Sequence, residues 1–182
     1  MAVVDVDGIH AARERVRRRV AEALGSDLAA IYESQRETGP YRFEPEAIGR
    51  RGLKNLALDY LMAGLQPAGL ELCRAQFAAA HNMTDVTAAL RHLVDLGGDA
   101  GQEALAEFYR RWSAEPLVID KWFALQAQSL HPEVLEHVKA LAEHADFTLR
   151  NPNRVRSLYM AFTGAPQGFH DPSGEGYRLV AD

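Results

Sequence analysis

Prolines divide this chain into short segments. Pro45, Pro67, Pro116, Pro132 and Pro152 each stand where a new helical pattern of apolar residues begins. Proline suits the first position of a helix, because its missing N–H is not needed there and its φ is already helical, whereas in a helix interior it breaks the helix. These prolines therefore predict successive short helices joined by tight turns, and such helices must pack antiparallel.

Apolar residues at spacings of three and four indicate further helices between and before the prolines. An amphipathic helix is expected over Ile9–Leu24 and another over about Asp27–Glu37. A helix capped by Thr84-Asp85 is closed by Gly97-Gly98, residues that favour helix ends. No sustained alternation of apolar and polar residues predicts a strand.

The spacing of the helix starts indicates a repeat. The expected starts are near Pro45, Pro67, Met83, Gly101, Pro116, Pro132 and Asn151. Alternate starts are about 31 to 38 residues apart, as in two-helix repeats. We therefore predict an all-α fold, an α-solenoid of stacked antiparallel helix pairs (a HEAT/ARM-like superhelix), forming a single helical-repeat domain over residues 1–182.

Two helices and the chain's end refine this prediction. The segment Pro116–Gln128 is apolar almost all round and should lie centrally, whereas Pro132–His144 has a one-sided apolar stripe and should lie outside. A new apolar pattern begins at Tyr177 and stops at Asp182. Since solenoids normally finish with a polar capping repeat, we expect the array to be truncated at this C-terminus.

Composition excludes several classes of function. The chain has 182 residues, 47% of them hydrophobic, which is typical of an ordinary soluble domain. A net charge of −5 argues against nucleic-acid binding. No apolar run approaches the roughly 20 residues that span a bilayer, and no secretory signal is evident. The one cysteine, Cys73, has the position of a core residue. A cytoplasmic protein without a membrane partner is expected.

The stretch Asn151–Leu158 is the candidate binding site. Asn151 can cap a helix that begins at Pro152, yet Arg154 and Arg156 lie in its first turns, where the helix dipole favours acidic residues. Dipole and guanidinium groups together give a positive region suited to a carboxylate. The candidate residues are Asn151, Asn153, Arg154 and Arg156.

A structural role for these arginines is the alternative. It would pair them with Asp146, Glu143 or a neighbouring helix. Because Arg154 and Arg156 are two residues apart and point to different faces, only one of them should face a ligand.

Three long runs carry a family resemblance. Tyr109–Trp112, Pro116–Ala127 and Phe147–Leu158 closely resemble the C-terminal helical domain of the bacterial aminopeptidase N family, and the resemblance covers essentially the whole chain. It implies a gluzincin-type zinc aminopeptidase, whose helical domain closes over the catalytic domain of the same polypeptide and shapes the chamber through which peptides reach the metal. The arginine that matches Arg156 faces this chamber in the family, and its partner arginine would lie beyond Asp182.

The chain departs from the family's catalytic pattern. It has neither H-E-x-x-H, which holds zinc and activates water, nor the G-x-M-E-N loop. His131, His137 and His144 are six and seven residues apart, and seven residues span about 10 Å of helix, too far for one ion. We therefore expect no metal or other cofactor in this chain, zinc only in the parent's catalytic domain, and no peptidase activity of the chain alone.

A second function remains open from the sequence. The chain would then be a free-standing helical-repeat module that binds a protein or peptide along its concave face. The reading frame upstream of Met1 would separate the two: continuation into H-E-x-x-H favours the aminopeptidase domain.

Overall fold

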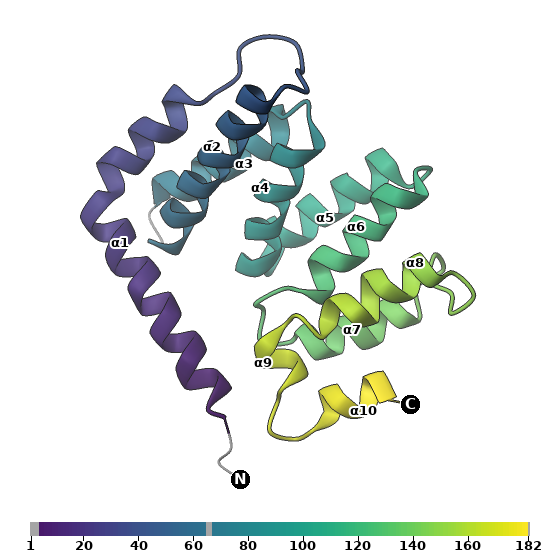
Figure 1. Cartoon of the computed structure of the whole chain (residues 1–182). Helices are drawn as coiled ribbons and strands as arrows, with labels where there is room; N and C mark the ends of the chain where they lie inside the picture. The colour runs from purple at the N-terminus through teal and green to yellow at the C-terminus, as the bar shows by residue number, and fades with distance from the viewer. Residues whose placement is uncertain (1–3, 65–66, 182) are drawn as a thin grey trace. The chain divides into compact units, whose positions relative to one another are not determined.

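The computed structural model describes residues 4–64 and 67–181, and all regular structure within these ranges is helical, as predicted (Figure 1). The helices, in chain order, are α1 (Val6–Ser34), α2 (Pro45–Ala63), α3 (Pro67–Ala79), α4 (Met83–Leu96), α5 (Gly98–Trp112), α6 (Pro116–Ala127), α7 (Val134–Ala142), α8 (Pro152–Val155), the π-helix η1 (Arg156–Met160), α9 (Pro166–Phe169) and α10 (Glu175–Ala181). They form two compact units, one of Gly8–His92 and one formed mainly by the residues from Leu93 onward.

In the first unit, α1 joins the two helices that the sequence predicts separately. The backbone leaves helical geometry at Leu24 (φ −117°, ψ 15°), the residue where the first helix was expected to end. Helices α2 and α3 begin at Pro45 and Pro67, as predicted. Cys73 is fully buried and its thiol lies 3.3 Å from the Ala89 carbonyl, so the predicted core position is confirmed.

The start of α4 corrects one prediction. The cap is Asn82, whose side-chain oxygen accepts the Asp85 N–H at 2.9 Å, and Thr84 is exposed in the first turn. Asn is as good an N-cap as Ser or Thr, and its position three residues before Asp85 lets it reach the free N–H. The helix end at Gly97-Gly98 is as predicted: both glycines have positive φ, and the Gly97 N–H donates to Leu93 and Val94.

Helix α6 is the centre of the second unit. It packs against α5, α7, α8 and η1, which confirms the central position expected from its apolar surface. Each large apolar side chain removed from water contributes about 1.5–3 kcal/mol, and α6 buries Ile119, Trp122, Phe123 and Leu125. Helix α7 buries one stripe and leaves its other face exposed, as expected of an outer helix.

Several boundaries differ from the predicted ones by a few residues. Helix α5 starts at Gly98 instead of Gly101, and Gly101 instead lies against α4, where a Cβ would come within 2.7 Å of the Leu93 carbonyl oxygen. Helix α7 starts at Val134, because the Glu133 N–H is bonded to the His131 ring in a turn. Helix α10 starts at Glu175, two residues before Tyr177. The described part of the chain has no helix whose length and hydropathy would suit a bilayer span.

Candidate functional site

The candidate site begins with the predicted cap. Asn151 has an extended backbone, and its side-chain oxygen accepts the N–H groups of Asn153 at 3.0 Å and Arg154 at 3.4 Å. Pro152 occupies the first helical position. The Asn151 side-chain oxygen therefore holds the start of α8, as its capping role requires.

Arg154 points into the molecule. It is buried, its Nη1 lies 3.2 Å from Asp120 Oδ1 on α6, and its guanidinium carbon lies 4.8 Å from the ring centroid of Phe123. The Arg154 N–H and the carboxylate are close but not aligned as a hydrogen bond, so their contact is electrostatic. Arg154 thus pairs with a neighbouring helix, through Asp120 rather than through Asp146 or Glu143.

Arg156 points the other way. Its side chain is exposed, and among the described residues it takes part in no side-chain hydrogen bond or ion pair. It opens the π-helix η1, in which the Ala161 N–H donates to the Arg156 carbonyl five residues earlier. Single π turns inside helices are rare and are frequent at functional sites. Asn153 is also exposed.

The structure therefore separates the four candidates. Asn151 caps the helix, Arg154 is bound inside, and Arg156 and Asn153 are on the surface. This agrees with the expectation that the two arginines face different sides. A role for any of them toward a substrate remains a prediction.

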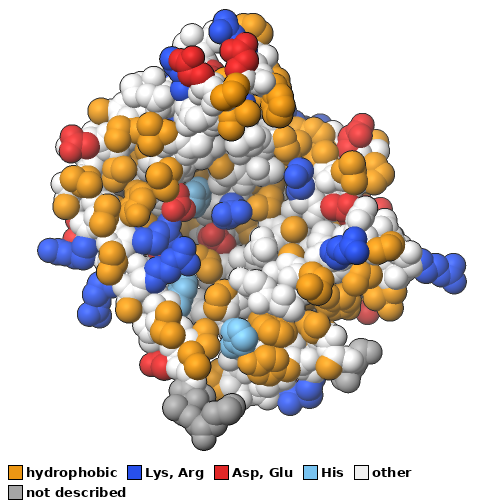
Figure 2. All heavy atoms as spheres, viewed as in Figure 1, with side chains coloured by type: hydrophobic (Ala, Val, Ile, Leu, Met, Phe, Trp, Pro, Cys, Tyr) orange, Lys and Arg blue, Asp and Glu red, His pale blue; other side chains and the backbone are white. Residues whose placement is uncertain are grey.

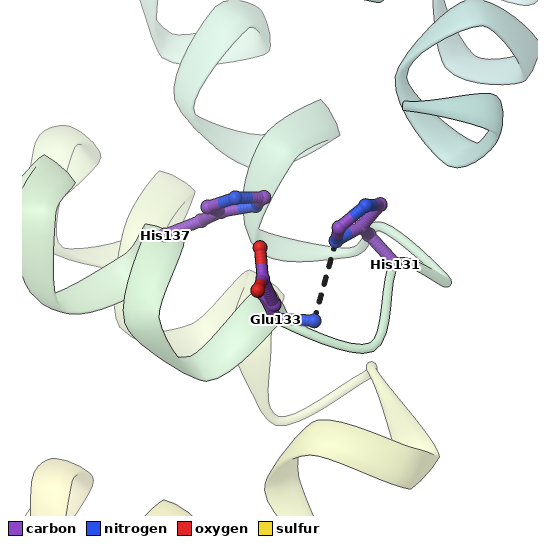
Figure 3. A group of neighbouring side chains, drawn as sticks. All are labelled: His131, Glu133 and His137. Carbon is purple, nitrogen blue, oxygen red and sulfur yellow. Dashed lines mark hydrogen bonds between the residues drawn. The ribbon is translucent and has the colours of Figure 1, made fainter. Parts of the chain in front are cut away.

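The histidines require a correction. The expected separations of His131, His137 and His144 were measured along a helix, but His131 lies before α7 and His144 lies after it. The rings of His131 and His137 stack with centroids 5.1 Å apart, and one ligand atom from each of His131, Glu133 and His137 lies within 4.8 Å of the others (Figure 3). His144 lies instead among aromatic rings, 5.2 Å from Trp122 and 5.5 Å from Tyr109.

The buried polar network of the first unit was not predicted from the sequence. Asp85 accepts from Lys54 Nζ at 2.7 Å, from Asn55 Nδ2 at 2.9 Å and from Asn82 Nδ2 at 2.9 Å, while Gln76 donates to the Asp85 carbonyl. A pocket next to this network is lined by Lys54, Gln76 and Asp85 among others. The spacing of Asn82 and Asp85 is a sequence signal for the cap, but nothing in the sequence around Lys54 marks it as buried.

The fold and the site together define an all-α repeat protein that presents, at a π-helical turn, an exposed arginine without an ion-pair partner among residues 4–64 and 67–181. The chain belongs to the family described as "Domain of unknown function (DUF3458_C) ARM repeats", which matches residues 1–182. This confirms both the predicted fold class and the resemblance to the C-terminal domain of bacterial aminopeptidase N.

Similar proteins cover nearly all of the chain. Aminopeptidase N of Caulobacter vibrioides is 41% identical over 179 residues, and that of Escherichia coli is 39% identical over 181 residues; the match is 98% and 99% of this chain and 21% of each relative. A crystal structure of Legionella pneumophila aminopeptidase A in complex with aspartic acid has a TM-score of 0.90 at 32% identity, covering 98% of this chain and 22% of that one. The chain thus spans about a fifth of these relatives.

Proposed function

We propose that this chain acts as the C-terminal helical domain of a zinc aminopeptidase, in which it closes over the catalytic domain of the same polypeptide and shapes the chamber that peptides enter. The observation that carries the proposal is the match of nearly the whole chain to about a fifth of aminopeptidase N from two bacteria. The zinc and its ligands would come from the catalytic domain, since this sequence has no H-E-x-x-H.

Exposed apolar side chains support the proposal that another domain contacts this chain. Ile9 and Val16 belong to the apolar stripe of α1, yet each is 63% exposed. Leu149 is 72% exposed in the turn before α8. Figure 2 shows hydrophobic side chains spread over the visible face among lysines and arginines. Ile9 and Val16 share one stripe of α1, and an exposed apolar stripe on a helix is a surface that another domain can cover.

Within this proposal, Arg156 meets the C-terminal carboxylate of a bound peptide. Its guanidinium group is exposed and free of protein partners among the described residues, and arginine binds carboxylates with two parallel hydrogen bonds. Arg154 contributes by holding α8 on α6 through Asp120, which fixes where Arg156 lies. Asn151 holds the same turn through its cap.

The test is made in the full-length polypeptide. We expect Arg156→Ala to lower kcat/KM for tripeptides by about tenfold to a hundredfold, the worth of one charge-assisted contact, and to leave the kcat/KM for aminoacyl anilides nearly unchanged, because they have no distant carboxylate. Arg110→Ala is the matched control, since Arg110 is an exposed arginine whose ion-pair partner, Glu107, lies on its own helix. Equal losses on both substrate types would count against a role for Arg156 at the peptide carboxylate.

The native size of the polypeptide tests the proposal more broadly. An antibody against this chain should detect a polypeptide several times larger than 20.1 kDa in cells of the source organism. A native band at 20.1 kDa would instead favour the free-standing binding module.

A further inference from the structure

Three potential metal ligands meet at the start of α7. Glu133 is the residue before the helix and His137 lies four residues later, so their side chains are on one face, one turn apart. His131 comes from the loop and turns back toward them. Figure 3 shows the two imidazole rings side by side above the Glu133 carboxylate. One nitrogen or oxygen atom of each residue lies within 4.8 Å of the other two.

The ring of His131 is held in place. A Cβ on Gly97 would lie 2.7 Å from the His131 Cδ2 and 2.8 Å from its Nε2, so this ring edge packs where only glycine leaves room. The other ring nitrogen, Nδ1, accepts the Glu133 N–H at 3.2 Å. A nitrogen that accepts a hydrogen bond carries no proton, so the ring presents an unprotonated Nδ1 toward Glu133 and His137. Nδ1 therefore faces the cluster, and it would give up this hydrogen bond to bind a metal ion.

The side chains of Glu133 and His137 are available to a metal ion. Within the described residues, neither the Glu133 carboxylate nor the His137 ring has a side-chain hydrogen bond or ion pair, while the nearby Lys139 pairs with Glu136 and Glu175 instead. Burial, together with the neighbouring His131, lowers the pKa of His137, against the opposing effect of Glu133.

We infer that His131, Glu133 and His137 form a binding site for a divalent transition-metal ion of the Zn²⁺ class. Two imidazoles and one carboxylate are a ligand set that suits zinc, with a fourth position open to water. Bonds of about 2.1 Å at tetrahedral angles place ligand atoms about 3.4 Å apart. Contraction from within 4.8 Å to this spacing would come from rotation of the exposed Glu133 and His137 side chains, and His131 would exchange its 3.2 Å hydrogen bond for the metal.

The Glu133 carboxylate also contributes negative charge to this site. The start of a helix carries partial positive charge, which opposes a cation. Glu133 supplies the negative charge that offsets it. Bound metal would tie the loop that carries His131 to the first turn of α7, and so stabilise this part of the second unit by mass action.

Zinc titration of the 182-residue chain by calorimetry, without an affinity tag and in a non-chelating buffer, tests the site. We expect one Zn²⁺ per chain, and we expect His137→Ala and Glu133→Gln each to weaken binding by at least about tenfold. His81→Ala is the matched control, because His81 is exposed and lies outside the cluster, and it should bind as the unchanged chain does. Both ligand variants change exposed side chains, and circular dichroism verifies that they fold.

Cobalt gives an independent readout. Co²⁺ bound in a site of low coordination number absorbs visible light, and this absorption should appear in the unchanged chain and be lost in His137→Ala. Absence of saturable Zn²⁺ binding, or binding that persists unchanged in both ligand variants, would overturn the inference.

Discussion

At the scale of single residues, Arg154 and Arg156 show how two identical side chains in one turn acquire different roles. Arg154 is 6% exposed and faces Asp120 and the Phe123 ring, whereas Arg156 is exposed. A buried charge must be compensated by a partner, whereas an exposed one is solvated by water. The turn therefore uses one arginine for packing and leaves the other available to a ligand.

This difference predicts unequal effects on stability. Arg154→Ala leaves Asp120 without its partner and removes the packing on Phe123, so it should lower the free energy of unfolding by about 2–3 kcal/mol, less than for a fully buried pair because the Asp120 side chain is 18% exposed. Arg156→Ala should change it by no more than about 0.5 kcal/mol. Urea denaturation followed by circular dichroism measures both. Equal losses would contradict the separation of roles.

At the scale of elements, the cap of α4 offers a matched comparison. Asn82→Ala removes the acceptor of the Asp85 N–H and one of the donors to the buried Asp85 carboxylate, so we expect a loss of about 1–2 kcal/mol in thermal or urea unfolding. Thr84→Ala, at the residue that the sequence favoured as the cap, should be nearly neutral, because Thr84 is exposed. A larger effect at Thr84 than at Asn82 would refute the assignment of the cap.

The elements also show what sequence patterns can predict. Prolines and apolar spacing located the helices, because both act locally through backbone geometry and the side of a helix that is buried. The partners of Arg154 and Asp85 come from other helices, at positions 120 and 54, and no local pattern specifies such pairs. The expected distance between His131 and His137 was wrong for the same reason, since the turn before α7 brings the two rings together, with centroids 5.1 Å apart.

The π-helix η1 illustrates the limit of periodicity. A π-helical turn contains about one residue more than an α-helical turn, so it changes which side chains face inward. The amino-acid composition does not reveal such a turn. Leu158 is nevertheless fully buried within η1, and Met160 two residues later is exposed. The two-residue spacing of Arg154 and Arg156 in the sequence predicts that they face different sides. Nothing in the sequence predicts the π-helical turn that begins at Arg156.

At the scale of the whole molecule, the exposed apolar side chains predict how the isolated chain behaves. Leu117, Leu149 and Met160 are 70%, 72% and 61% exposed, and without a covering domain such side chains associate with one another. We expect light scattering to give a mass that rises with concentration above the 20.1 kDa of one chain. Leu149→Lys combined with Met160→Lys should move the mass toward that of one chain.

The control for this prediction carries the same change of charge, two added lysines, at polar positions. Gln102→Lys combined with Gln167→Lys changes exposed residues of α5 and α9 and should leave self-association nearly unchanged, because it removes no apolar surface. If this control reduces the mass as much as the leucine and methionine changes do, net charge governs association. A mass of one chain at every concentration would mean that these side chains need no covering domain, and the support that they lend to the proposed domain contact would be lost.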